Sequence, residues 1–338
     1  MVRLHFPKHF DFLNMPFSNG LDGGRNASIQ KVLIIGDNRK AASISKSLPA
    51  EEGITEIYHA VHRQSTLKPS GNIRIHPTDF SADSLRSVFS YVKPGVIFST
   101  SSGGSYDFQR QLIDLAIEFR VPRFVAAEYE QDSLNSKIQA RLPPCRERAR
   151  VIEYLQQRSS QNQIEWAAVA TGCALDQGLI SGNLGFDIKW QSVTVHGTGQ
   201  ERFAASSTAW IGQVTVAILN NWEAIKNQYF YASGTITSAN EILNALQIQT
   251  GQNWERGEVE VEEAMREAER RMDRGFPDAA MFLMEKSVLC DESLDALKPF
   301  IEQDCKEKLG LQTESLDELV MHAVHEFQHH GKGGCGCD

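Results

Sequence analysis

The chain has 338 residues, of which 41% are hydrophobic and 23% charged, as is ordinary for a globular protein. Its formal net charge of -9 disfavours nucleic acid as a partner, because a phosphate backbone requires a basic patch that the sequence lacks. No apolar run approaches the length of a membrane span, and the N-terminus does not read as a signal peptide. We therefore expect a cytoplasmic protein with free thiols, a small-molecule substrate and no membrane contact; a homodimer is left open.

The predicted elements begin after an N-terminal extension. Residues 1–30 carry several phenylalanines and then a Gly/Asn-rich stretch, and we expect them to pack on the body or stay loose, with a lid over the substrate as the alternative. Residues 31–36, KVLIIG, form a short apolar run that ends in glycine. Such a run is typical of a buried parallel strand.

Strands and helices then alternate along the chain. Strands are expected at 57–61, 73–75, 95–99, 123–126 and 166–170, and helices at 40–48, 84–91, 108–119 and 147–157. This alternation predicts a parallel sheet with right-handed crossovers. The predicted fold is an α/β protein with a Rossmann-like doubly wound parallel sheet and a smaller C-terminal substrate-binding lobe.

The domain boundaries follow from this pattern. We expect an NAD(P)-binding domain at 31–170 and a substrate lobe at 171–328, with a segment near 204–235 that returns to the first domain. Residues 178–206 look irregular or β, whereas 208–219, 238–250 and 261–274 are expected to be helices and 228–232 a strand. Residues 285–329 look mostly helical, and the glycine-rich tail at 329–338 is predicted to be flexible.

The turn after the first strand is the predicted site for a pyrophosphate, which requires glycines and a helix N-terminus. Gly36 keeps the first glycine of a G-x-x-G-x-x-G pattern, but Arg39 stands at the second position and Ala42 at the third. Arg39 either crowds the phosphates or binds them. Asp37 would oppose an anion, and Asn38 completes the turn.

The cofactor type is predicted from the end of the second strand. An acidic residue there would favour unphosphorylated ribose, but Arg63 occupies this region and suits a 2′-phosphate. NADP(H) is therefore favoured over NAD, with a solvated loop charge as the alternative reading of Arg63. Further cofactor contacts are expected at residues that follow strands three, four and five: Asp79, Phe80, Ser99, Thr100, Ser101, Ala126 and Glu128.

Two later segments resemble a known family. Residues 121–132, VPRFVAAEYEQD, resemble the V-K-R-F-x-P-S-E-[FY]-G-x-D segment of NmrA-like and isoflavone reductase-like proteins. A second part of the family pattern is similar to residues 164–172, IEWAAVATG, and to the DQGL and GNLGFD stretches that follow. The resemblance runs from about residue 31 to 254. It implies an atypical short-chain dehydrogenase fold, NADPH binding and reduction of a small metabolite, and it is nearest to fungal members of specialised metabolism.

The expected catalytic residue departs from the family pattern. No Tyr-x-x-x-Lys pair is present, and the resemblance aligns Arg148 with the lysine that the related reductases use. Arginine cannot act as a general base near neutral pH, but it can stabilise an enolate or alkoxide. A surface charge on a helix is the alternative for Arg148, and Lys137 would substitute only if its loop folds back. Tyr129 is expected to line the pocket, with a packing role as its alternative.

Two residues after the sixth strand, Thr171 and Cys173, are expected near the substrate, although a cysteine there is more often a buried small residue. The helix near the end of the chain contains an H-E-x-x-H pattern at His325, Glu326 and His329. Because no third ligand follows at a usable spacing, we interpret it as an exposed helix rather than a metal site.

The sequence thus predicts an NADP(H)-dependent oxidoreductase acting on a small specialised metabolite. Because both the turn and the lysine have changed, we expect an unusual step, such as reduction of an imine, iminium or enone, with or coupled to cyclisation. Two alternatives stay open: a non-catalytic dinucleotide-sensing regulator that binds a protein partner, and a cofactor-independent cyclase or isomerase.

Overall fold

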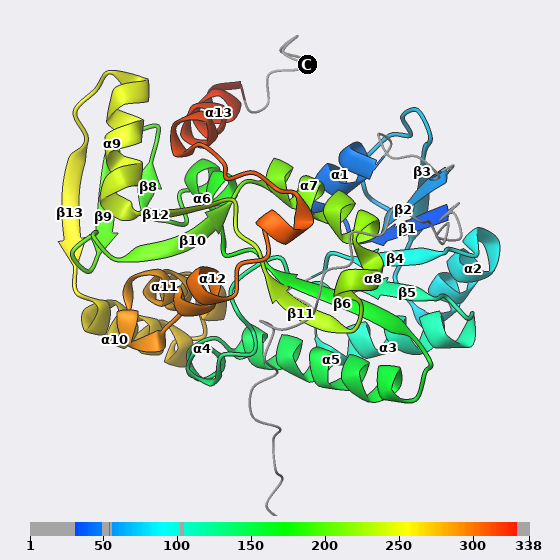
Figure 1. The fold of residues 1–338 in the computed structure, drawn as a ribbon. Coiled ribbons are helices and arrows are strands. Elements are labelled where there is room, and N and C mark those ends of the chain that lie inside the picture. The colour runs from blue at the N-terminus through cyan, green and yellow to red at the C-terminus, as the bar shows by residue number, and fades with distance from the viewer. Residues whose placement is uncertain (1–30, 49–53, 55, 102–104, 330–338) are drawn as a thin grey trace, which may run out of the picture.

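The computed structural model describes residues 31–48, 54, 56–101 and 105–329. The expected N-terminal extension and residues 330–338 of the expected tail lie outside this part of the chain, whereas His329 closes the last helix. Two bodies of secondary structure share the described residues, a large twisted sheet covered by helices and a lobe with smaller sheets (Figure 1).

The large sheet has seven parallel strands in the order β11-β6-β5-β4-β1-β2-β3. Its strands are β1 (Lys31–Ile35), β2 (Glu56–His62), β3 (Ile73–Thr78), β4 (Val96–Ser99), β5 (Arg123–Val125), β6 (Glu165–Ala170) and β11 (Gln228–Tyr231). The order reverses between β1 and β4, where a doubly wound sheet opens a crevice for ligands. The predicted Rossmann-like fold class is confirmed.

Helices cover both faces of this sheet. One face carries α1 (Arg39–Ser47), α7 (Thr208–Asn220) and α8 (Trp222–Ile225), and the other carries α2 (Ala82–Val92), α3 (Tyr106–Glu118) and α5 (Pro143–Ser160). The side chains of β1 pack against the helices on both faces of the sheet. Val32 and Ile34 pack under α1 and α7, and Leu33 and Ile35 pack under α2 and α3. A strand buried on both faces must be apolar throughout, which explains its sequence.

The lobe holds two three-stranded sheets, β12-β10-β7 and β13-β9-β8. Their strands are β7 (Cys173–Ala174), β8 (Phe186–Asp187), β9 (Ser192–His196), β10 (Arg202–Ser206), β12 (Thr235–Ser238) and β13 (Glu255–Val259). Its helices are α6 (Leu175–Ser181), α9 (Ala239–Thr250), α10 (Val261–Asp273), α11 (Pro277–Cys290), α12 (Lys298–Glu302) and α13 (Leu316–His329). Helices α6, α9 and α13 share one apolar core with β9 and β10.

The structure differs from the expected elements in four places. Helix α6 stands where an irregular or β segment was expected, because buried Leu175 and Leu179 anchor it to the lobe core. Helix α4 (Ser136–Arg141) was not expected; Asn135 caps it by accepting from two backbone N–H groups. Strand β13 was not expected either; it is an exposed edge strand whose sequence lacks an apolar alternation. The C-terminal segment that was expected to be mostly helical is broken into α11, two short 3-10 turns, α12 and α13.

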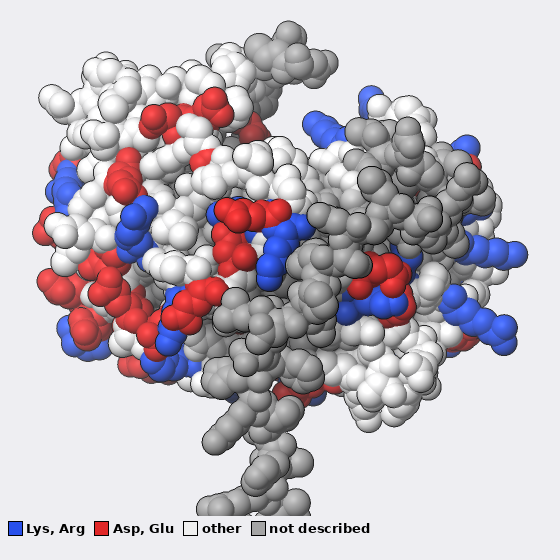
Figure 2. Space-filling view, in the orientation of Figure 1, with Lys and Arg blue, Asp and Glu red and all other residues white. Residues whose placement is uncertain are grey.

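No described helix is long and apolar enough to cross a membrane. On the face drawn in Figure 2, basic and acidic side chains lie interspersed over the lobe. Along α10, Glu267 forms ion pairs with both Arg270 and Arg271. Such exposed pairs contribute little to stability, so the fold depends on its apolar layers.

Candidate functional site

The turn after β1 has a backbone that favours glycine. Gly36 has φ +140°, and a Cβ there would lie 2.1 Å from Thr100 Oγ1. Asn38 caps α1 by accepting a hydrogen bond from Ala41 N at 2.9 Å, and its Nδ2 donates to Thr100 O at 2.8 Å. The side chain of Asp37 is exposed and accepts a hydrogen bond from Ser65. The turn is thus fastened to the segment after β4, at the reversal point of the sheet.

Arg39, at the second glycine position, points away from the turn. Its guanidinium forms an ion pair with Glu326 of α13. Both side chains line a cleft of about 670 Å³ that runs between α1, α7 and α13. Arg39 therefore leaves the backbone of the turn uncrowded, and its charge is held by a partly exposed carboxylate that another anion can replace.

A second group of predicted residues lies where β2 and β3 end. Arg63 pairs with Asp79 at 3.0 Å, with 64% and 42% of their side chains exposed. Phe80 adopts φ 59°, an unusual backbone for a bulky residue, and its ring faces His62 and Phe108 with centroids 6.4 and 6.0 Å away. An exposed guanidinium beside an aromatic cluster suits a phosphorylated ribose and a base.

The segment after β4 supplies two fixed residues and one accessible one. Ser99 and Thr100 are fully buried; Ser99 Oγ donates to Gln109 Oε1 at 2.9 Å, and Thr100 Oγ1 donates to Ile35 O at 3.1 Å. Ser101 is half-buried and lines a small cavity together with Ala126, Glu128 and Arg148. This cavity joins predicted cofactor residues to the predicted catalytic arginine.

Arg148 is the centre of a buried group of charges. Its residue is only 6% exposed, which excludes the surface-charge alternative. Nη1 donates to Glu130 Oε2 at 2.8 Å, Nε lies 3.4 Å from Glu128 Oε2, and Nη2 donates to Gln131 O at 3.3 Å. Lys40, from the first turn of α1, completes the group by binding Glu130 Oε1 at 2.6 Å. The two basic side chains thus meet over one loop, the one that follows β5.

Glu128 is the most buried acid of this group, with 1% of the residue exposed. Burial raises its pKa to about 7, against the opposing effect of the Arg148 charge. Tyr229 Oη donates to its Oε2 over 3.4 Å, and this same hydroxyl accepts from Ser133 N at 3.1 Å. A carboxyl with this pKa can hold or release a proton near neutral pH. The Arg148 guanidinium stays charged, because the two glutamates raise its pKa against the opposing effect of burial.

The remaining predicted residues lie in other surroundings. Tyr129 has φ 46° and is fully buried in the apolar core beneath α1 and α7, a packing position in which burial raises its pKa. Lys137, on α4, is half-exposed and donates to Ser293 O at 2.7 Å beside Asp295. Thr171 is buried, and its carbonyl accepts from Ser206 Oγ at 2.7 Å. Burial raises the pKa of Cys173 to about 12, so its thiol is protonated at neutral pH.

The sequence reasoning missed three charged residues of this site, Lys40, Glu130 and Glu285. Lys40 follows the predicted Arg39 and lies in the first turn of α1, and Glu130 follows the predicted Tyr129 in the loop after β5. Their position at the start of a helix or after a strand is the only local signal. Glu285 comes from α11, which is distant in sequence. Partial desolvation and the charge of Glu130 raise the pKa of Glu285, whereas the charges of Arg148 and Lys40 lower it, so Glu285 lies within electrostatic range of this charge group.

The H-E-x-x-H pattern lies on α13, where the rings of His325 and His329 face each other with centroids 4.2 Å apart and Glu326 binds Arg39. Within residues 31–329, apart from the gaps at 49–53, 55 and 102–104, no group of three or more His, Cys, Asp or Glu is arranged to hold a metal ion.

The strand order and the reversal point of the sheet define a Rossmann-like α/β protein, and solved structures share this fold. AtPrR2 in complex with NADP+ and (+)-pinoresinol superimposes with a TM-score of 0.67 at 17% identity, covering 87% of this chain and 99% of that chain. Leucoanthocyanidin reductase from Vitis vinifera gives 0.68 at 14% identity with the same coverage. An isoflavone reductase gives 0.66 at 14% identity.

Sequence comparison identifies the family. Residues 60–310 match the sequence model of the NmrA-like family. Oxidoreductase aprR of Aspergillus flavus is 30% identical over 258 residues, which are 76% of this chain and 86% of that protein. Oxidoreductase poxI of Penicillium oxalicum is 28% identical over 138 residues, or 40% of this chain and 44% of its own. The chain belongs to the NmrA-like family, as the sequence predicted, and its named relatives are oxidoreductases.

Proposed function

We propose that the protein is an NADP(H)-dependent oxidoreductase that reduces a small metabolite in the crevice between the large sheet and the lobe. The observation that carries this proposal is that Ser101, Glu128 and Arg148 line one cavity of about 10 Å³, which brings the segment after β4 next to the acidic loop after β5. In a doubly wound sheet this edge is where a dinucleotide meets its substrate. AtPrR2, a structure of the same fold, is a complex with NADP+ and (+)-pinoresinol, which supports the proposal that this fold holds a dinucleotide together with a small molecule.

The residues of the turn and of β2 fit a phosphorylated dinucleotide. Gly36 and the N-terminus of α1 would hold the pyrophosphate, with Arg39 released from Glu326 as an additional contact. Arg63 would exchange Asp79 for the 2′-phosphate, and Phe80 would cover the base. When bound, NADPH supplies a hydride.

The buried charges favour a particular substrate class. Arg148 provides a fixed positive charge and no transferable proton near neutral pH, because a guanidinium does not deprotonate in this range. Glu128 and Glu130 hold it in place. An iminium carbon needs no proton for its reduction, since the C=N π electrons become the nitrogen lone pair. An enone needs one proton, and Glu128 is the group that can hold it at neutral pH. We therefore infer an iminium or enone substrate.

One observation favours a second candidate, a dinucleotide-binding regulator without turnover. Arg148 is bound on both sides by Glu128 and Glu130, and Lys40 is bound by Glu130 as well. A cation neutralised in this way polarises a substrate less than a free lysine. In this reading the protein would bind NADPH and leave it unoxidised.

Calorimetric titration with NADPH and NADH tests the proposal. We expect tighter binding of NADPH than of NADH, and the Arg63→Ala variant should lose about tenfold or more of this preference because the 2′-phosphate loses its guanidinium. Arg74→Ala is the matched control, since Arg74 is an exposed arginine on β3 that pairs with Glu56, at the other end of β2 from Arg63. An absence of dinucleotide binding would overturn the proposal and favour a cofactor-independent cyclase.

A turnover assay then separates the two candidates. A panel of cyclic iminium salts and aromatic enones is incubated with the protein and NADPH, and the loss of NADPH absorbance is followed. Oxidation that depends on one of these substrates supports the reductase. Tight NADPH binding with no oxidation across the panel supports the regulator.

A further inference from the structure

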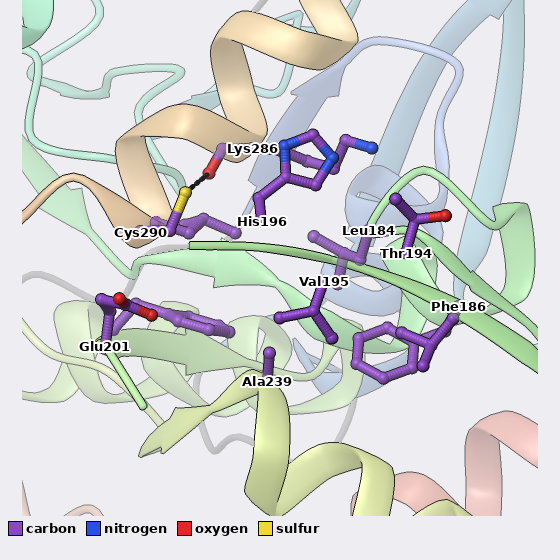
Figure 3. A pocket seen from close by; sticks show the side chains of 12 residues that line it. Leu184, Phe186, Thr194, Val195, His196, Glu201, Ala239, Lys286 and Cys290 are labelled. Atoms are coloured by element: carbon purple, nitrogen blue, oxygen red, sulfur yellow. Dashed lines mark hydrogen bonds between the residues drawn. The ribbon is translucent and has the colours of Figure 1, made fainter. Parts of the chain in front are cut away.

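A small pocket inside the lobe is separate from the cavity of Ser101, Glu128 and Arg148. It lies between β9, β10 and α11 and has a volume of about 40 Å³ (Figure 3). Its walls are mostly apolar, from Phe186, Val193, Val195, Phe203 and Leu289. A space of this size admits a group of a few heavy atoms, such as a carboxylate, but not a whole aromatic ring.

His196, at the end of β9, has an unsatisfied polar atom at this pocket. The residue is 8% exposed, and its Nδ1 is buried without a hydrogen-bond partner among the described residues. Burial and the neighbouring charge of Lys286 lower the pKa of His196 to about 4, so the ring is neutral at physiological pH. Because buried polar atoms in folded proteins are normally hydrogen-bonded, this ring lacks a partner that a ligand or ordered water supplies.

Lys286, on α11, is the second unsatisfied group. It is half-buried, and no carboxylate in the described part of the chain lies within ion-pair distance of its ammonium. Lys40 and Lys137, in contrast, each bind an acid. Figure 3 shows its side chain running alongside the ring of His196. The desolvation of the ammonium and the charge of Arg271 lower its pKa, which indicates that the charge at this end is not neutralised.

The other polar residues of the pocket are already satisfied. Glu201 accepts hydrogen bonds from Thr198 N at 3.0 Å and Gly199 N at 2.9 Å, and Cys290 Sγ donates to Lys286 O at 3.3 Å. In Figure 3, Glu201 lies at the opposite end of the pocket from the ring of His196. The pocket therefore has apolar walls, one satisfied acidic end and one end with an unpaired ammonium and an unpaired imidazole.

We propose that this pocket is a binding site for a compact organic carboxylate, whose oxygens bind Lys286 and His196 and whose apolar part contacts the phenylalanine and valine walls. The imidazole supplies a neutral N–H donor and the ammonium a charge, which together suit a carboxylate better than a neutral amide. Two sources share this chemistry. The acid is part of the substrate of the proposed reductase, or it is a separate small acid that occupies the lobe.

Binding is tested by calorimetric titration of the full-length protein with propionate and with propionamide, its neutral isostere. We expect propionate to bind and propionamide to bind at least about tenfold more weakly. Lys286→Met should reduce the propionate affinity about tenfold or more, and Lys286→Arg should retain most of it. Lys298→Met, at an exposed lysine that lies about 4.0 Å from Glu302, is the matched control and should change nothing.

The imidazole signal of His196 in NMR spectra gives an independent readout of the site. Addition of propionate should shift the signal that is missing in His196→Gln, and a shift confined to other histidines would contradict the proposal. Equal binding of propionate to the wild type and Lys286→Met, equal binding of propionamide, or no binding at all would each overturn it. Water alone would then satisfy Nδ1.

The source of the acid is tested separately with NADPH and a matched pair of aromatic enones, one carrying a carboxylate and the other its methyl ester. A lower KM for the acid, lost in Lys286→Met at unchanged kcat, makes the pocket a subsite of the substrate. Propionate binding with no such preference makes it a separate site. This part rests on the proposed function, but the propionate titration does not, so a protein that fails to oxidise NADPH leaves the test of the pocket intact.

Discussion

Arg148 of α5 and Glu130 of the loop after β5 form a 2.8 Å charge-assisted hydrogen bond inside the protein, and Glu128 approaches the same guanidinium from the other side. Three charges thus share a region with little water. Removal of Arg148 leaves Glu128 buried without its cationic partner, which is more costly than the pair itself is stabilising.

The Arg148→Met variant should therefore lose about 3–5 kcal/mol of unfolding free energy, measured by urea denaturation near neutral pH. Arg146→Met is the control on the same helix, because Arg146 is exposed and only donates to Gln139 O at 3.4 Å. It should change stability by less than about 1 kcal/mol. Equal losses in the two variants would contradict the buried charge group.

Glu128 should make stability depend on pH. Burial raises its pKa to about 7 from an ordinary value of 4.5, so the folded state keeps a proton that the unfolded chain releases. The free energy of unfolding therefore falls as pH rises from about 4.5 to about 7, by about 3 kcal/mol at most. In Glu128→Gln, which cannot titrate, urea denaturation across this range should show a smaller fall, and an unchanged slope would refute the shift.

His196 should change the free energy of unfolding with pH in the opposite direction. Burial lowers its pKa to about 4 from 6.5, so the unfolded chain binds a proton that the folded state does not. Stability from this residue is present above about 6.5 and is lost as pH falls toward 4. His196→Gln should show a weaker loss in acid than the wild type, whereas His62→Gln, at an exposed histidine, should follow the wild type.

Gly36→Ala should destabilise the protein by about 3 kcal/mol, because the left-handed backbone is strained for alanine and its Cβ meets Thr100 Oγ1 at 2.1 Å. Gly71→Ala separates the two effects. Gly71 also has a positive φ, of +57°, but no atom lies within 4 Å of its added Cβ. It should lose only about 1–2 kcal/mol, and a similar loss at both positions would remove the case for a tight turn.

Glu326→Gln should strengthen NADPH binding, because it frees the Arg39 guanidinium that Glu326 holds. The expected gain is about threefold to tenfold, and it should disappear in the double variant with Arg39→Ala. Glu318→Gln, on the same helix and also lining the cleft, is the control. Weaker binding in Glu326→Gln would mean that Arg39 serves only to dock α13.

Part of the candidate site follows from the order of the strands. Parallel strands all end at the same edge of a sheet, and each of these site residues follows or faces the end of a predicted strand. This edge therefore brings together Gly36, Ser101, Glu128 and Arg148. The direction of a side chain is less predictable. Tyr129 follows a strand as Glu128 does, yet its positive φ turns it into the core.

The sequence by itself determined the alternation of strands and helices, the altered turn and the family, because periodicity and short motifs are local properties of the chain. The tertiary structure alone decided what each charge does. Arg39 binds a residue 287 positions away, and Arg148 is buried because a loop 18 residues earlier folds over it with two acids. Neither pairing has a period or a motif, since an ion pair depends on which surfaces the packed layers bring together.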